Sequence, residues 1–153
     1  MIHVRSYLLD DRDFVLSLAP RLTIGMPAWR DPQLCLAAVQ GWITGSIDQN
    51  GKKTMVFVAV DEHGERLGFV TVTTETYFTG ERQAYIGELA TSEEAEGRGA
   101  GKALVQTCEQ WARDQGYRII SLVTGAANGR ALGFYRRLGY KEEDIRLIRL
   151  LDE

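Results

Sequence analysis

Residues 88–104 of this 153-residue chain read ELATSEEAEGRGAGKAL, and the other elements of the sequence are arranged around them. The stretch opens as the end of a strand, turns through acidic residues and meets glycines at alternate positions, Gly97, Gly99 and Gly101. Beyond Gly101, apolar residues recur at helical spacing. A strand, a glycine loop and a helix in this order aim unpaired backbone N–H groups at an anion, and the helix dipole adds favourable potential. The stretch therefore predicts a phosphate-binding turn.

Two common phosphate-binding motifs do not match this turn. A Walker A loop needs Gly five residues before its Gly-Lys pair and Ser or Thr after the lysine, but these positions hold Glu96 and Ala103. A Rossmann fingerprint needs G-x-G-x-x-G, whereas residues 97–101 read G-x-G-x-G and no opening βαβ unit precedes them. A glycine-rich turn without a ligand remains an alternative at this point.

A second motif lies downstream, where residues 128–140 read NGRALGFYRRLGY. With the glycine loop, it resembles the GNAT superfamily of N-acetyltransferases, in which a helix of the form N-x-x-A-x-x-F-Y-x-x-x-G-[FY] follows an acyl-CoA pyrophosphate loop, roughly [QR]-x-x-G-x-[GA]. Gly99 and Gly101 match the loop glycines. Glu96 stands where the family has Gln or Arg, which is a departure from the pattern.

The resemblance covers nearly the whole chain and implies a single N-acetyltransferase domain over residues 2–153. The implied fold is α/β (α+β), the GNAT fold: a central mixed, mostly antiparallel sheet with splayed strands and helices on both faces, in the order β-α-α-β-β-β-α-β-α-β. Strands are expected over residues 2–8, 54–60, 67–76, 83–91, 118–124 and 141–151. Helices are expected after a cap at Asp10 or Asp11, after Asp31-Pro32 with a buried stripe of Leu34, Cys35, Ala38 and Trp42, after Gly101, and from Asn128 to Gly139.

The resemblance also implies a binding site for acetyl-CoA. Main-chain groups at the end of the preceding strand would pair with the pantetheine arm, and backbone N–H groups of the loop would bind the pyrophosphate. The implied donor-binding residues are Leu89, Ala90, Thr91, Gly97, Arg98, Gly99, Ala100, Gly101, Lys102, Asn128 and Tyr135. We expect the Glu96 side chain to turn outward, toward Arg98. Arg130 and Arg136 are candidates for the 3′-phosphate, or belong to an ordinary solvated helix face.

Two catalytic residues are predicted for transfer to a primary amine. Tyr135 is the expected acid, because a phenol with a pKa near ~10 can donate to a thiolate whose conjugate acid is near ~8.5. Glu88 is the first candidate for the general base and Glu75 the second, and a solvated carboxylate is the alternative for both. Tyr77, Tyr85 and Trp29 are candidates for the acceptor pocket.

The implied activity is acetyl transfer from acetyl-CoA to an amine of a small molecule or peptide, directly in a ternary complex. Two alternatives stay open: a catalytically silent CoA-binding or interaction module of the same fold, and an enzyme that uses a longer acyl-CoA. The expected partners are acetyl-CoA and the amine acceptor, and the resemblance allows for a homodimer.

Composition narrows the remaining function classes. A net charge of −3 argues against a general nucleic-acid binder. Cys35 and Cys108 lie in helical patterns and read as free thiols of a reducing compartment. With no signal peptide or long apolar run, we expect a cytoplasmic protein that does not enter a membrane. The only histidines are His3 and His63, so no metal site is expected.

Overall fold

The structure is a computed structural model that describes residues 1–153. Its strands form one five-stranded sheet in the order β1-β2-β3-β4-β5, in which β5 is parallel to β4 and all other pairs are antiparallel. The strands are β1 (His3–Ser6), β2 (Thr54–Val60), β3 (Arg66–Thr76), β4 (Arg82–Thr91) and β5 (Ile120–Leu122). The helices are α1 (Arg12–Ser17), α2 (Pro32–Asp48), α3 (Ala100–Asp114) and α4 (Gly129–Arg137), with short 3₁₀ helices η1 (Leu9–Asp11), η2 (Ala19–Thr23) and η3 (Glu93–Ala95).

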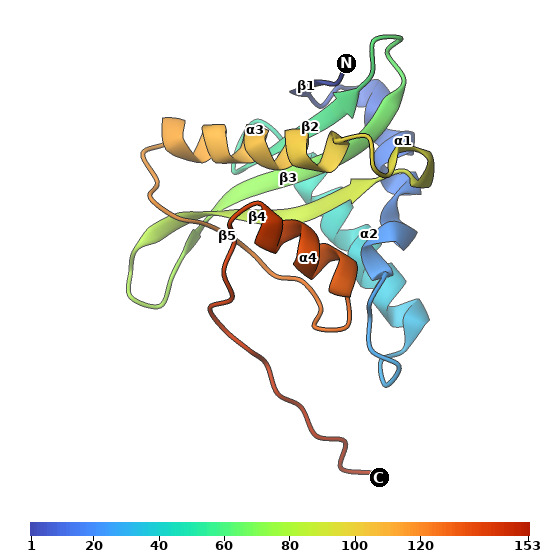
Figure 1. The fold of residues 1–153 in the computed structure, drawn as a ribbon, viewed down its shortest axis with the longest axis vertical. Helices are drawn as coiled ribbons and strands as arrows, with labels where there is room; N and C mark the ends of the chain where they lie inside the picture. The colour runs from blue at the N-terminus through green and yellow to red at the C-terminus, as the bar shows by residue number, and fades with distance from the viewer.

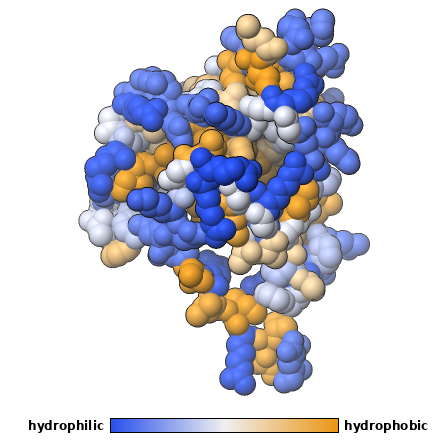
Figure 2. Space-filling view, viewed as in Figure 1, coloured by the Kyte–Doolittle hydropathy of each residue, from blue (hydrophilic) through white to orange (hydrophobic).

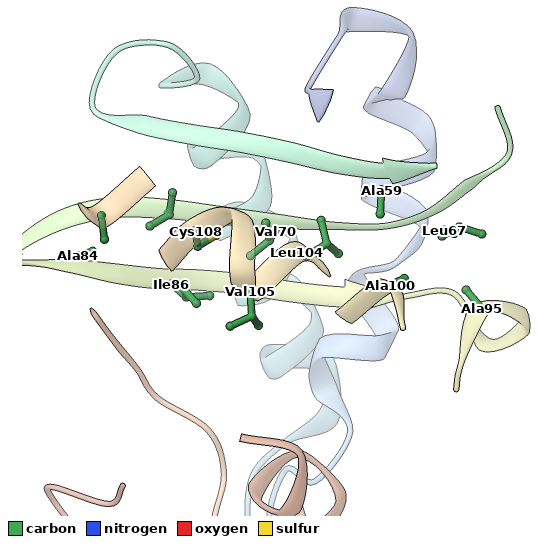
Figure 3. Close-up of a cluster of buried hydrophobic side chains, with 12 residues drawn as sticks. Ala59, Leu67, Val70, Ala84, Ile86, Ala95, Ala100, Leu104, Val105 and Cys108 are labelled. Atoms are coloured by element: carbon green, nitrogen blue, oxygen red, sulfur yellow. The ribbon is translucent and has the colours of Figure 1, made fainter. Parts of the chain in front are cut away.

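Helices cover both faces of the sheet, as predicted: α3 and α4 lie on one face, and α1 and α2 on the other (Figure 1). On one face, Leu104 and Cys108 of α3 pack on Val70 of β3 and Ile86 of β4 in a core of 12 buried residues (Figure 3). Side chains of alternate strand residues point to opposite faces, so the intervening positions supply a second core under α1 and α2. That core includes Val15, Val39, Ile43, Val56, Val58 and Phe69.

The buried stripe of α2 differs from the predicted one. Val39 and Ile43 are fully buried, whereas Leu34 and Trp42 are among the exposed large hydrophobic residues. The helix is apolar around much of its circumference, so its sequence alone favours no single face. The sheet selects the face, and Trp42 is left at the surface.

Asp11 ties the N-terminal segment to the sheet. Its fully buried carboxylate accepts hydrogen bonds from Arg5 at 2.8 and 3.0 Å, from Arg66 at 2.7 Å and from the Leu8 N–H at 2.7 Å. Burial alone would raise the pKa of Asp11, but these bonds outweigh it and hold the pKa well below its usual range. Asp11 stands at the N-cap position of α1, one of the two positions predicted, but its carboxylate is engaged elsewhere and makes no cap bond to the helix.

Residues 141–151, predicted as a final strand, form no strand. They leave α4 as an extended segment that runs away from the sheet (Figure 1). Ile145, Leu147 and Leu151 are 80, 89 and 90% exposed, and hydrophobic atoms stand out on this segment at the lower edge of Figure 2. Alternating apolar residues need a neighbouring strand to pair with, and β5 is only three residues long where seven were expected. The free edge of β5 is therefore short.

No helix of the structure is both long and apolar enough to cross a membrane.

Candidate active site

The glycine loop between β4 and α3 uses its glycines for two different reasons. Gly97 and Gly99 have positive φ angles of 77° and 89°, which residues with a Cβ rarely adopt. Gly101 has no such angle, but a Cβ there would lie 3.3 Å from the Phe134 ring of α4. The first two glycines shape the turn, and the third lets α4 approach α3 closely.

The N-terminus of α3 presents unpaired donors next to this turn. Gly99 is the N-cap residue and offers no side chain to cap the helix. The N–H groups of Ala100, Gly101 and Lys102 precede the first intrahelical bond, so they have no acceptor within the helix. The dipole of α3 adds positive potential at the same point. These N–H groups form a cluster of unpaired donors, and their binding of a phosphate stays a prediction.

Arg98 differs from its neighbours in this cluster. Its main-chain N–H donates to the Ala95 carbonyl at 3.2 Å, so it is not free for a phosphate. Its guanidinium lies 3.5 Å from a carboxylate oxygen of Asp61, in the β2–β3 turn. Contact between Arg98 and a donor stays a prediction, and it requires the side chain rather than the main chain.

Glu96 pairs with two arginines, and Arg98 is not one of them. Its carboxylate accepts from Arg21 of η2 and from Arg130 of α4, the latter at 2.7 Å. These hydrogen bonds, first from Arg130 and then from Arg21, lower the pKa of Glu96. The expectation that Glu96 turns toward Arg98 is therefore wrong. The carboxylate stands beside the N–H cluster with its charge compensated by two cations.

β4 and β5 separate beside this loop, as predicted for splayed strands. They pair only where Ala84, Tyr85 and Ile86 face Ile120, Ser121 and Leu122. Beyond Ile86, the edge of β4 that faces away from β3 has no strand beside it. The last five residues of β4 thus offer main-chain groups to a ligand that lies between the two strands.

Pairing with β3 decides which of these main-chain groups point to the open edge. The Ser92 N–H donates to the Leu67 carbonyl at 2.9 Å, which makes Gly68–Thr91 a non-hydrogen-bonded pair of the ladder. Such pairs alternate, so the main-chain groups of Leu89 and Thr91 point to the open edge and those of Ala90 point to β3. Arg21 already uses part of this edge, because its Nε donates to the Thr91 carbonyl at 3.1 Å.

A β-bulge in β4 sets the orientation of Glu88. Ile86 pairs with Val72 and Leu89 with Val70, so Gly87 and Glu88 both oppose the single residue Thr71. The extra residue turns Glu88 to the α2 face, the face that also carries Tyr85. A Cβ at Gly87 would lie 3.0 Å from the Thr71 hydroxyl oxygen, so a larger residue there would have to displace that hydroxyl.

The Glu88 carboxylate lies at a cavity of about 420 Å³ on this face. It is 7% exposed and accepts a hydrogen bond from the Ser46 hydroxyl at 2.6 Å. Burial raises the pKa of Glu88, and hydrogen bonds from Ser46 and Thr71 oppose the rise in part. The cavity is lined by Trp42, Gly45, Ser46, Thr54, Tyr85, Gly87 and Glu88.

Sequence reasoning missed Ser46 and Trp42 of this lining, and two of its three candidates for the acceptor pocket do not line it. Ser46 carried no signal in the sequence, and Trp42 was assigned to the buried stripe of α2. Tyr85 lines this cavity and Tyr77 does not, whereas Trp29 lies at a separate hollow with Ile148 and Leu150 of the C-terminal segment.

Tyr135 lies on the other side of β4. It packs, as Leu89 does, against the core under α3, with its ring centroid 5.0 Å from Phe134 and 5.7 Å from Tyr140. Burial raises the pKa of Tyr135 to about 12, so the phenol stays protonated at neutral pH. The Tyr140 hydroxyl donates to Glu109, whereas the Tyr135 hydroxyl has no such partner.

Asn128 has a structural role in this structure. Its Oδ1 accepts from the Ala131 N–H at 3.2 Å, which confirms the predicted cap of α4. Its Nδ2 donates to the Ile24 carbonyl at 3.3 Å and so ties the loop before α2 to α4. A contact with the donor stays a prediction, because both ends of the amide are used within the chain.

Comparison with known proteins identifies the class to which this fold and site belong. The model of the acetyltransferase (GNAT) family matches residues 19–140. The chain belongs to the acetyltransferase (GNAT) family.

Individual relatives agree with this assignment. The chain is 32% identical over 91 residues to an uncharacterised N-acetyltransferase of Methanocaldococcus jannaschii, and 27% identical over 113 residues to the L-methionine sulfoximine/L-methionine sulfone acetyltransferase of Pseudomonas paraeruginosa. These matches cover 58 and 74% of this chain but only 40 and 64% of the two relatives. The fold resembles a putative acetyl transferase from Pyrococcus furiosus, with a TM-score of 0.77 at 21% identity over 99% of this chain and 100% of that one.

Proposed function

We propose that the protein transfers an acetyl group from acetyl-CoA to a primary amine of a small molecule or peptide, directly in a ternary complex. One observation carries this proposal: two features lie along the open edge of β4. The unpaired N–H groups of α3 follow the end of the strand, and the buried Glu88 carboxylate lies in a cavity at the residue before Leu89. A donor along that edge would bring its thioester close to an amine in the cavity.

The residues present fit the donor. The N–H groups of Ala100, Gly101 and Lys102, together with those of Gly97 and Gly99, would hold the pyrophosphate. The main-chain groups of Leu89 and Thr91 would pair with the pantetheine amides, with Arg21 giving up its bond to the Thr91 carbonyl. This arrangement leaves Ala90 bonded to β3, so its contribution is steric.

Acetyl-CoA supplies the acetyl group as a thioester, which an amine can attack without prior activation of the donor. Glu88 takes a proton from the ammonium group of the acceptor, directly or through a water molecule, so that the nitrogen lone pair can bond to the carbonyl carbon. The Leu89 N–H, at the open edge, is placed to donate to the carbonyl oxygen as negative charge develops there. Tyr135 donates its proton to the sulfur as the carbon–sulfur bond breaks, and the nitrogen gives up its second proton to solvent, from which Tyr135 is reprotonated.

The roles of Glu88 and Tyr135 rest on their environments. A carboxyl with a raised pKa is a stronger base than a solvated one, and the cavity holds it within reach of an acceptor. A phenol with a pKa of about 12 is protonated before the reaction, so it can donate a hydrogen bond to the leaving sulfur. β4 separates the two groups, with the acceptor cavity on one face and Tyr135 on the other.

Calorimetric titration of acetyl-CoA, with CoA alone as comparison, tests donor binding first. We expect micromolar binding. No binding at millimolar acetyl-CoA would instead support the alternative, a catalytically silent interaction module. Titration with longer acyl-CoAs tests the donor. Thiol release with an amine panel then tests the chemistry. Tyr135→Phe should lower kcat far more than it changes the KM for acetyl-CoA, and an unchanged kcat would remove Tyr135 from the mechanism.

A further inference from the structure

The acceptor cavity holds the carboxyl group of Glu88 without a cationic side chain beside it. None of its lining residues is Lys, Arg or His, and α2, which forms one wall, contains no basic residue. Glu88 takes part in none of the ion pairs of the chain, although the residue is only 7% exposed. A buried carboxylate without a counter-ion is costly, and a cationic ligand would remove that cost.

A second carboxylate lies on the same face of the sheet. Glu75 of β3 pairs in register with Gln83 of β4, and its Oε2 accepts from the Ser121 hydroxyl at 2.9 Å. Ser121 pairs in register with Tyr85, which lines the cavity, so the polar residues at Glu75 and Ser121 lead toward the cavity. Glu75 also forms no ion pair; its hydrogen-bond partner Ser121 and its register partner Gln83, which donates to Ser121, are both neutral.

Tyr85 lies between the two carboxylates. Glu88 follows it along β4, and Glu75 is two residues past Thr73, the register partner of Tyr85 on β3. Trp42 stands at the rim of the same cavity with its side chain exposed. Faces of Trp and Tyr rings attract ammonium groups, so the space between the carboxylates is also favourable to a cation.

We propose that the acceptor is a linear aliphatic polyamine, whose reacting nitrogen lies at Glu88 and whose second ammonium group lies at Glu75. This inference rests on the proposed acetyl transfer and names its substrate class. Glu75 lies four residues along β3 from Thr71, the residue that opposes Glu88, which places the two carboxylate positions roughly 13 Å apart. An extended triamine suits such a separation better than a compact amine does.

The same charges disfavour an α-amino acid. Its carboxylate lies next to the reacting nitrogen and would enter the cavity beside Glu88, where no basic residue receives it. Two carboxylates close together in a poorly solvated site repel each other strongly. The amino-acid sulfone acetylated by the Pseudomonas relative is therefore a useful negative probe for this chain.

Thiol release measured with matched acceptors tests the proposal. Spermidine, putrescine, butylamine and L-methionine sulfone are compared at saturating acetyl-CoA. We expect kcat/KM to fall in that order, with spermidine at least 100-fold above butylamine and the amino acid lowest. Equal values for spermidine and butylamine, or a preference for the amino acid, would overturn the proposal. No thiol release with any of the acceptors would instead count against the proposed enzyme.

The variant Glu75→Gln tests the contribution of the second carboxylate apart from that of Glu88. Because Gln keeps the size and can still accept from Ser121, the fold should be retained. We expect kcat/KM for spermidine to fall at least tenfold more than kcat/KM for butylamine. Calorimetric titration of spermidine into the CoA-bound protein gives a readout that does not need turnover, and Glu75→Gln should weaken this binding at least tenfold. Equal losses for the two amines, or unchanged spermidine binding, would remove Glu75 from the site.

Discussion

The main-chain N–H of Glu88 donates to the Thr71 hydroxyl oxygen at 2.9 Å, across the bulge of β4. A residue in a bulge loses its regular ladder partner, and here a side chain from the neighbouring strand replaces it. Thr71 is buried, so no water molecule takes over this role. The position of the proposed base therefore depends on one hydroxyl group of β3.

Thr71→Val should destabilise the protein by about 1–3 kcal/mol, because it preserves the shape of the side chain but leaves a buried N–H without an acceptor. Thr71→Ser, which keeps the hydroxyl, is the control and should retain most of the hydrogen bond. Urea unfolding followed by circular dichroism compares the two. If Val and Ser variants unfold at the same urea concentration, the hydroxyl does not support the bulge.

Asp11→Asn should destabilise the protein by about 3 kcal/mol, since it removes the charge that Arg5 and Arg66 share. This is the lower end of the usual range, because both arginines keep partial contact with solvent. Asp10→Asn, at the exposed neighbouring position, should cost less than about 0.5 kcal/mol. Similar losses in both variants would mean that the Asp11 cluster, the ion pairs of Asp11 with Arg5 and Arg66, adds no more stability than an exposed carboxylate does.

The Asp11 cluster also predicts a pH dependence. The folded pKa of Asp11 lies below its unfolded value of about 3.9, so its stabilisation is complete above that pH and is lost as the pH falls toward the folded pKa. The stability difference between wild type and Asp11→Asn should therefore shrink below about pH 4. Unfolding at pH 7 and pH 3 measures this difference, and a constant difference would contradict the assignment.

Arg130→Gln should weaken acetyl-CoA binding about fivefold, or about 1 kcal/mol, because it removes a cation beside the N–H cluster and leaves Glu96 less compensated. Arg137→Gln is a matched control, because it removes an exposed arginine of the same helix to which no donor contact is assigned. We expect less than a twofold change for it. Calorimetry at two salt concentrations makes the comparison, and equal effects would show that only net charge matters.

Deletion of residues 143–153 should change the melting temperature by less than about 2 °C, because an unpaired, exposed segment contributes little to folding. Light scattering before and after the deletion reports the association state and so also tests the homodimer expected from the sequence. A larger loss of stability, or a halved mass, would mean that the segment pairs with a sheet edge in solution, its own or that of a second copy.

The parts of the site predictable from sequence are those encoded locally. The glycine loop and α4 depend on residues close together in the chain: Gly97 and Gly99 supply the backbone angles, and Asn128 caps the helix that follows it. Such signals survive in any tertiary context. The order of the elements along the chain, apart from the final strand, and the placement of helices on both faces of the sheet followed from the resemblance of these two motifs to a family.

The parts that could not be predicted depend on distant pairing. Glu96 and Arg21 are 75 positions apart, and nothing in the sequence marks them as partners. Strict alternation along β4 would put Glu88 on the face of Ala84 and Ile86, under α3. Only the register with β3 reveals the bulge that moves it to the α2 face. The prediction of a final strand over residues 141–151 is wrong for a related reason, since apolar alternation does not specify the sheet edge with which a strand pairs.

The bulge at Gly87 makes the placement of Glu88 a matter of phase along β4. The extra residue reverses the alternation of side chains between the two faces of the sheet for all later residues of β4. The faces of Leu89, Ala90 and Thr91 therefore depend on how many residues precede them in the strand rather than on their own side chains. A substitution at Glu88 changes the group in the cavity but not the direction in which position 88 points. Only an insertion or a deletion resets that direction, and it would exchange the two faces for the whole approach to the glycine loop. In relatives of this chain, the length of β4 should therefore be more constrained than its composition.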